Sequence, residues 1–196
     1  LDKAKQDQYF EMMMSQAQRM KSLVEDLLTL ANLEANTLPA PIQEMSIATL
    51  MALLKNDAEA LSQGHHTLSF EISNANNLMG EEREILSAFG NLVSNAIRYT
   101  PDAASIKVRW SINERGEGEF SVIDTGPGIA SEHLSRLTER FYRVDRSRSR
   151  DTGGTGLGLA IVKHIANRHQ AQLIINSTPG QGSTFTLRFP KERISV

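Results

Sequence analysis

The sequence has no cysteine among its 196 residues, which excludes disulfide scaffolds, thiolate metal sites and cysteine nucleophiles. An excess of one charge is also lacking, because 21 Lys and Arg residues stand against 23 Asp and Glu residues. A general electrostatic attraction for nucleic acid is therefore not expected. No apolar run approaches the roughly 20 residues that a membrane-spanning helix needs. The composition, 40% hydrophobic and 22% charged, is that of a globular protein with room for one domain and an appendage.

Glycine and proline are absent from residues 1–36, where good helix formers predominate. Apolar residues repeat there at spacings of three and four, at Phe10, Met13, Ala17, Met20, Val24, Leu27 and Ala31. This heptad register predicts a long helix whose apolar stripe needs a partner, most simply a second copy of the chain. An ordinary helix packed on its own domain is the alternative. Residues 37–42, with Pro39 and Pro41, predict a linker before a globular part at 43–196.

The globular part mixes helical and strand patterns. We expect helices at residues 47–62, capped by Ser46, at 81–99, and from Gly156 to about His169. Alternating apolar residues predict strands at 67–72, 106–112, 120–124, 173–177 and 184–189. Because neighbouring strands form antiparallel hairpins, the expected fold class is α+β, a two-layer sandwich with helices on one face of a mixed sheet.

Two asparagines, Asn91 and Asn95, lie four residues apart and therefore on one face of the helix predicted at 81–99. Asparagine is mildly unfavourable inside a helix, so a pair within an apolar stretch calls for a reason. Amide oxygens suit Mg²⁺, and Arg98 and Tyr99, about one turn further on, are placed to meet phosphates. Solvent-facing or locally capping amides are the alternative.

The segment from Asp124 to Ile129 places a carboxylate at a strand end, followed at once by Gly126 and Gly128. A buried ionised aspartate is costly unless it accepts hydrogen bonds. The exocyclic amine of adenine would donate one, whereas guanine presents an acceptor at that place. The motif therefore predicts an adenine-selective pocket, with an ordinary turn as the alternative.

A second glycine-rich segment runs from Gly153 to Gly158 and opens a helix, which makes it a candidate phosphate site. It matches neither the P-loop nor the dinucleotide fingerprint in spacing. Residues 138–151, between the two glycine motifs, carry five arginines. We interpret this segment as a lid that covers a polyphosphate, with Phe141 and Tyr142 anchoring the lid. A solvated loop is the alternative. The five histidines show no metal-binding spacing and are expected on the surface or in loops.

In this order the motifs resemble the catalytic region of bacterial sensor histidine kinases. Residues 91–101 are similar to the N box, 124–128 to the first glycine box, 139–145 to the F box and 154–158 to the second glycine box. Residues 20–35 resemble the second helix of the dimerisation domain. The likeness is closest to the kinases of the phosphate regulon. It implies the Bergerat ATP-binding fold of gyrase and Hsp90.

The resemblance also implies roles for individual residues. Asn95 would coordinate Mg²⁺ with help from Asn91, and Arg143 would act with them on the γ-phosphate of ATP. The implied nucleotide-binding residues are Asn91, Asn95, Arg98, Tyr99, Asp124, Gly126, Gly128, Ile129, Arg143, Gly154, Thr155, Gly156, Leu157, Gly158 and Thr184. The implied partners are a second copy of the kinase and a PhoB-type response regulator. The implied setting is the cytoplasmic part of an inner-membrane sensor, with no membrane contact by this piece.

Two differences from the motifs of related proteins limit which reactions the chain is expected to catalyse. Asn91 occupies the place where the hydrolytic relatives carry a water-activating glutamate, and an amide is no general base. This favours phosphoryl transfer over hydrolysis. The His-Glu/Asp-x-Arg-Thr-Pro box of the phospho-accepting helix is absent from the sequence. We therefore expect Mg·ATP binding without self-phosphorylation. The alternatives are a hydrolytic ATPase and a non-catalytic, nucleotide-sensing dimer module.

Overall fold

The computed structural model describes residues 2–35, 42–74, 76–144 and 154–195. Its helices are α1 (Lys3–Ala35), α2 (Ile47–Ser62), α3 (Glu82–Tyr99), α4 (Ser131–Leu134) and α6 (Gly158–Arg168), with a 3-10 turn η1 (Lys191–Arg193). Its strands are β1 (Gln43–Ser46), β2 (Thr67–Ile72), β3 (Asn77–Gly80), β4 (Ser105–Ile112), β5 (Gly118–Asp124), β6 (Gln172–Thr178), β7 (Gly182–Phe189) and β8 (Ile194–Ser195).

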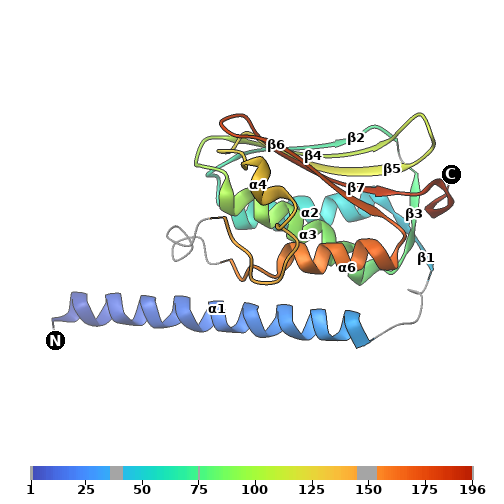
Figure 1. Ribbon diagram of the computed structural model, residues 1–196. Helices are drawn as coiled ribbons and strands as arrows, with labels where there is room; N and C mark the ends of the chain where they lie inside the picture. The colour runs from blue at the N-terminus through green and yellow to red at the C-terminus, as the bar shows by residue number, and fades with distance from the viewer. Residues whose placement is uncertain (1, 36–41, 75, 145–153, 196) are drawn as a thin grey trace.

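The main sheet has the strand order β2-β4-β5-β7-β6. The β2–β4 pair is parallel and the other three pairs are antiparallel, so the sheet is mixed, as expected. Helices α2, α3 and α6 cover one face of it (Figure 1). The sequence patterns did not predict β1, β3 and β8, which form a small second sheet in the order β1-β3-β8.

Aromatic and branched side chains fill the layer between sheet and helices. Phe89 of α3 stacks on Phe120 of β5 with ring centroids 3.7 Å apart and planes 3° from parallel. On β4, Ile106, Val108 and Trp110 are fully buried, so alternate residues of the strand face the helices as the sequence predicted. Burial of these large side chains fixes α3, the helix with the two asparagines, against the sheet.

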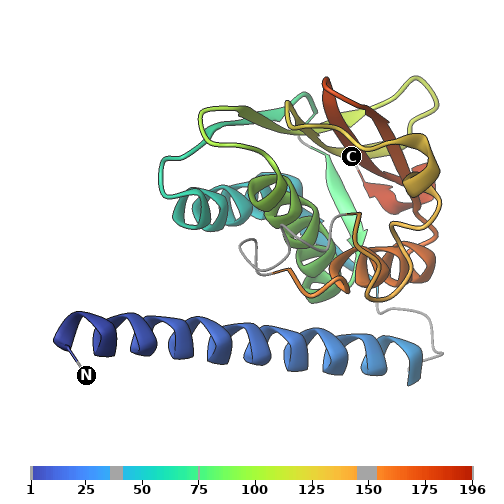
Figure 2. The same cartoon turned by 60° about the vertical axis from the view of Figure 1, so that its left-hand side comes forward.

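Helix α1 lies beside the sandwich rather than within it, along α6 (Figures 1 and 2). Leu30 and Leu33 near its C-terminal end are buried, 2% and 9% exposed. The heptad stripe faces elsewhere: Met13 and Met20 are 66% and 60% exposed. The long helix is confirmed, and in a single copy of the chain its stripe stays uncovered.

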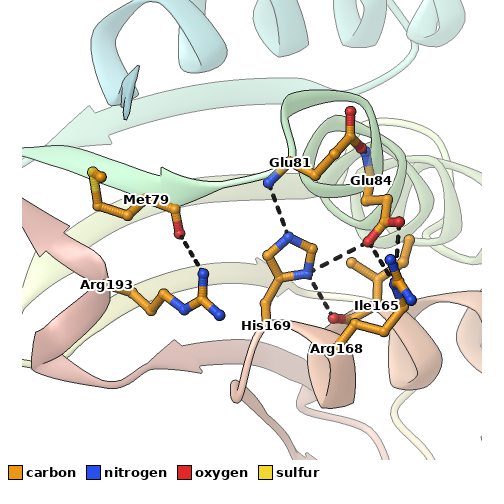
Figure 3. Close-up of polar contacts among 7 residues, drawn as sticks. All are labelled: Met79, Glu81, Glu84, Ile165, Arg168, His169 and Arg193. Carbon is orange, nitrogen blue, oxygen red and sulfur yellow. Dashed lines mark hydrogen bonds and ion pairs between the residues drawn. The ribbon is translucent and has the colours of Figure 1, made fainter. Parts of the chain in front are cut away.

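The prediction that all histidines lie on the surface or in loops is wrong for His169, which is fully buried where α3, α6 and η1 meet (Figure 3). Its Nε2 accepts a hydrogen bond from the backbone N–H of Glu81 at 3.1 Å. A backbone N–H only donates, so the ring proton is on Nδ1, which donates to the Ile165 carbonyl at 2.9 Å. Glu84, itself paired with Arg168, lies 3.7 Å from Nδ1. His169 thus joins the start of α3 to the end of α6.

Candidate functional site

The two asparagines of α3 face a common cavity, and a hydrogen bond defines the amide orientation of Asn91. Asn91 Nδ2 donates to the Ser87 carbonyl at 2.8 Å, which leaves its Oδ1 as an acceptor. A Cβ atom on Gly158 would approach that Oδ1 to 2.6 Å and Asn95 Nδ2 to 3.8 Å. The absence of a side chain at Gly158 therefore keeps the space in front of both amides open. The neutral oxygen of Asn91 suits a hard cation.

Asp124 ends β5 and is 8% exposed. Its Oδ1 accepts the backbone N–H of Gly126 at 2.9 Å, and the backbone N–H of Ser183 also donates to the carboxylate. Removal from water nevertheless raises the pKa of Asp124 above its usual 3.8, because these two hydrogen bonds do not fully offset the burial. The carboxylate is thus suited to accept a further donor from a ligand.

The loop after Asp124 is held close to the β6–β7 turn. Gly128 has φ +68°, and a Cβ there would collide with the Thr178 carbonyl. The Pro127 carbonyl accepts the N–H of Gly180 at 2.8 Å, and the Ile129 N–H donates to Ser177 Oγ at 2.8 Å. Glycine is required at position 128 for both its conformation and its close approach to the backbone of Thr178.

The second glycine segment is fixed from two sides. The carbonyl of Gly154 accepts from Arg143, and the carbonyl of Gly156 accepts the N–H of Phe141 at 2.9 Å. Phe141 itself is 58% exposed, so of the two residues predicted to anchor the lid, Phe141 contributes here through its backbone and not by packing its ring. Tyr142 does pack inward, with its hydroxyl 2.7 Å from His133 Nδ1. The rest of the predicted lid, residues 145–151, lies outside the described residues.

Residues from each of these segments border one cavity of about 720 Å³. Twelve of the fifteen candidate residues line it: Asn91, Asn95, Arg98, Tyr99, Asp124, Gly128, Ile129, Arg143, Gly154, Thr155, Gly156 and Gly158. Asp124 lies beside the C-terminal end of α3, near Thr100, whereas Asn91 faces the start of α6. Nine residues of helix, about 13 Å at 1.5 Å each, separate Asn91 from Thr100. The Asp124 carboxylate therefore lies at one place in the cavity, and the asparagine amides and the second glycine segment lie at another.

Three candidates do not line the cavity. Gly126 contributes its N–H to Asp124, and Leu157 is a fully buried core residue. On β7 the side chains that line the cavity are those of Ser183 and Phe185, not Thr184. Side chains alternate along a strand, and Phe185, Leu187 and Phe189 are the buried apolar residues of β7. That alternation was visible in the sequence and puts position 183 on the cavity face.

Sequence patterns also missed a contribution from α1. Ser22, Glu25 and Asp26 line the cavity, and Asp26 Oδ2 accepts from Thr155 Oγ1 at 2.6 Å. No local motif marks these residues, since they reach the cavity only through the docking of α1. The described residues hold no cluster of three or more His, Asp or Glu side chains able to bind a metal. No helix among them is long and apolar enough to cross a membrane.

Curated relatives match almost the whole chain. The phosphate regulon sensor protein PhoR of Pseudomonas aeruginosa is 51% identical over 186 residues, 94% of this chain and 42% of the relative. The sensor-like histidine kinase SenX3 of Mycolicibacterium smegmatis is 35% identical, over 93% of this chain and 48% of the relative. The chain thus spans less than half the length of these relatives.

Solved structures share the fold. ShkA, solved at full length in complex with AMPPNP, aligns with a TM-score of 0.81 over 98% of this chain and 39% of that one, at 24% identity. The histidine kinase AdeS of Acinetobacter baumannii aligns with a TM-score of 0.73 over 93% of this chain and 83% of that one, also at 24% identity. Both confirm the two-layer sandwich with its preceding helix.

The family assignment comes from the globular part. Residues 80–193, from the end of β3 to η1, match the family described as histidine kinase-, DNA gyrase B- and HSP90-like ATPases. This stretch holds every cavity-lining residue except those of α1. The chain belongs to the family of histidine kinase-, DNA gyrase B- and HSP90-like ATPases.

Proposed function

We propose that this chain is the ATP-binding catalytic part of a two-component sensor histidine kinase. In this proposal it transfers the γ-phosphoryl group of Mg·ATP to a histidine on a dimerisation helix, and from there the group passes to a response regulator. Phosphate-limitation signalling is the proposed setting, because the 51% identical relative is a phosphate regulon sensor. The observation that carries the proposal is the cavity shared by Asp124, the two asparagines and the second glycine segment.

The residues present fit adenine at one place and a metal-bound polyphosphate at another. The buried carboxylate of Asp124 has capacity for one more donor, and the adenine amine supplies it. Asn95, with the Oδ1 of Asn91, would hold Mg²⁺, which neutralises phosphate charge when bound. Arg98, Tyr99 and Arg143 line the same cavity and would contact the phosphates. These side chains bind and orient, which is the main requirement of phosphoryl transfer.

The chemistry and hydrogen bonding of the Asn91 amide favour phosphoryl transfer over hydrolysis. Its amide is bonded through Nδ2 to the Ser87 carbonyl, and an amide oxygen does not take a proton from water at ordinary pH. Of the described carboxylates that line the cavity, Asp124 is engaged by two backbone N–H groups and the others belong to α1. A hydrolytic ATPase of the same family is the second candidate.

Calorimetry with Mg·ATP and Mg·GTP tests the binding site. We expect ATP to bind and GTP to bind far more weakly, and Asp124→Asn to weaken ATP binding roughly 10- to 100-fold, because a hydrogen bond to a charged group is lost. Thr125→Ala is the matched control, since Thr125 is the exposed neighbour and does not line the cavity. Equal affinity for both nucleotides, or unchanged binding in Asp124→Asn, would overturn the adenine site.

Incubation with γ-labelled ATP tests the reaction. The chain alone should acquire no acid-labile label, because the His box is absent from its sequence. A histidine-box helix supplied in trans should acquire label, and Asn95→Asp should abolish that transfer. Rapid release of labelled inorganic phosphate by the chain alone would instead support the hydrolytic candidate.

A further inference from the structure

Tyr142 is held in the cavity wall by two side chains of the segment that precedes it. It lines the cavity, and its ring packs against the core. Its hydroxyl lies 2.7 Å from Nδ1 of His133, a residue of α4, and the guanidinium carbon of Arg136 lies 4.2 Å from the centroid of its ring. His133 and Arg136 are not among the described residues that line the cavity. They act on a bound ligand through Tyr142.

The surroundings of the His133 imidazole give the direction of its hydrogen bond to Tyr142. Nε2 of His133 lies 3.6 Å from the carboxylate of Glu132, which favours a proton on that nitrogen. In the neutral ring Nδ1 is then unprotonated and accepts, so the Tyr142 hydroxyl donates. This bond and the guanidinium of Arg136 restrain the Tyr142 side chain at its hydroxyl and at its ring face.

The residues on both sides of Tyr142 are bonded to the second glycine segment. The N–H of Phe141 donates to the Gly156 carbonyl at 2.9 Å, and Arg143 donates to the carbonyl of Gly154. Phe141 has φ +61°, a left-handed conformation that is unfavourable for a residue with a Cβ. Such a conformation persists only where surrounding contacts hold it. The bond to Gly156 and the anchored side chain of Tyr142 are the contacts that hold Phe141.

Release of Tyr142 would therefore let the strained backbone at Phe141 relax, and the position of Arg143 would change with it. Arg143 lines the cavity beside Gly154, where the proposed function places the phosphates. Asp124, the proposed adenine acceptor, lies at another place in the cavity and belongs to β5. Loss of the Tyr142 anchor should therefore weaken ligands that carry phosphates and spare those that do not.

We propose that His133 is a positioning residue of the nucleotide site, which holds Tyr142 in the cavity wall and thereby keeps Arg143 in place for the phosphates of a nucleoside triphosphate. This inference rests on the proposed function and adds a residue that does not itself touch the ligand. It gives a function to a histidine that the sequence predicted only as a surface or loop residue.

Calorimetry with Mg·AMPPNP and with adenosine tests this role. His133→Phe keeps a planar ring without an acceptor, and should bind Mg·AMPPNP roughly five- to tenfold more weakly, the change expected for one neutral hydrogen bond. Tyr142→Phe removes only the hydroxyl and should show the same loss. The double variant should lose no more than either single variant, because both remove the same bond. Adenosine should bind all four proteins alike.

The position of the acceptor provides a matched pair of substitutions. The amide oxygen of asparagine is bonded to Cγ, as Nδ1 of histidine is, whereas that of glutamine lies one atom further from the backbone. His133→Asn should therefore keep most of the wild-type affinity for Mg·AMPPNP, and His133→Gln should not. His65→Phe is the control, because that ring is exposed beside Asp102 and does not line the cavity. It should bind Mg·AMPPNP as wild type does.

The possible outcomes separate this inference from the proposed function. If wild type binds Mg·AMPPNP and Tyr142→Phe binds it equally well, His133 has no positioning role although the nucleotide site stands. Equal losses for adenosine and Mg·AMPPNP, additive losses in the double variant, or no rescue by His133→Asn would each overturn the inference as well. Tyr142→Phe decides the matter if His133→Phe does not fold. Absence of any nucleotide binding by wild type would overturn the proposed function, and the role of His133 with it.

Discussion

Two buried titratable side chains, Asp124 and His169, differ in how completely their hydrogen bonds are satisfied. Burial raises the pKa of the Asp124 carboxyl and lowers the pKa of the His169 imidazole, so in both cases it disfavours the charged form. Both ring nitrogens of His169 are already bonded, to Glu81 and Ile165. Asp124 borders a cavity and retains acceptor capacity. This difference distinguishes His169, a structural residue, from Asp124, a candidate ligand-binding residue.

His169 contributes to the pH dependence of stability. Burial holds the pKa of His169 below its usual 6.5, with Arg193 and Arg168 acting in the same direction and Ile165 and Glu84 against it. The unfolded chain binds a proton near pH 6.5 and the folded chain does not, so stability is full above that pH and is lost as the pH falls towards the lowered pKa. The loss is at most about 1.4 kcal/mol per pH unit.

Urea unfolding at pH 7.5 and at pH 5.5 measures this loss. His169→Gln should be less stable than wild type at the higher pH, because two buried hydrogen bonds are disturbed, and should show a smaller difference between the two pH values. His65→Gln serves as the control, since that ring is exposed beside Asp102. A His169→Gln variant that keeps the wild-type pH dependence would show that the slope arises elsewhere.

Sequence reasoning selected candidate site residues where their chemistry conflicted with their surroundings. Asn91 and Asn95 interrupt an apolar helix, and Asp124 ends a buried strand. It selected Thr184, whereas the neighbouring residues Ser183 and Phe185 line the cavity, because the choice between neighbouring strand residues depends on alternation and the buried partners of the strand. It misjudged His169, because the sequence around a single histidine does not indicate which backbone groups will form hydrogen bonds with its ring.

At the scale of elements, long periodic segments were predictable and short paired ones were not. The helix at 81–99 and the strand at 106–112 have enough repeats to set their period. By contrast, β1 and β3 have four residues each and β8 has two. The β3–β8 pair joins residues that lie more than 100 positions apart, such as Leu78 and Ile194, and the β1–β3 pair joins residues more than 30 positions apart, such as Ser46 and Asn77. Such a short segment forms a strand only because its partner strand is present. A local sequence pattern does not contain that information.

A second prediction at the scale of elements concerns Gly158, at the contact between α3 and α6. Gly158→Ala should improve helix propensity but place a Cβ 2.6 Å from Asn91 Oδ1, which displaces a flexible amide rather than backbone. Stability should therefore change little, whereas Mg·ATP affinity should fall about tenfold or more through loss of the oriented amide. Isothermal calorimetry and thermal unfolding of the same preparation separate the two effects.

Gly90 provides the matched control for that substitution. It lies inside α3, and a Cβ there meets nothing within 4 Å. Gly90→Ala should stabilise the chain by roughly 0.5–1 kcal/mol and leave nucleotide affinity unchanged. If Gly158→Ala bound Mg·ATP as tightly as Gly90→Ala, the orientation of Asn91 would not matter to the site.

At the scale of the whole molecule, α1 has two faces, one packed on the globular part and one exposed. The face with Leu23, Leu30 and Leu33 packs on the globular part. The heptad stripe is on the other side, with Val24 and Leu27 54% and 42% exposed. The heptad spacing correctly predicted a stripe that this domain does not bury. It did not predict the docked face, because that contact depends on where α6 and the second glycine segment come to lie.

An exposed stripe of this length predicts self-association through α1. Sedimentation equilibrium of the chain should show a concentration-dependent dimer, and Met20→Glu should dissociate it. Each dimer would lose two buried methionines, at roughly 1.5–3 kcal/mol each, so the dissociation constant should rise at least about 100-fold. Met12→Glu is the control, because Met12 is similarly exposed but lies outside the register. A chain that stays monomeric at every concentration reached, or one that Met12→Glu disrupts equally, would show that the stripe does not pair two copies.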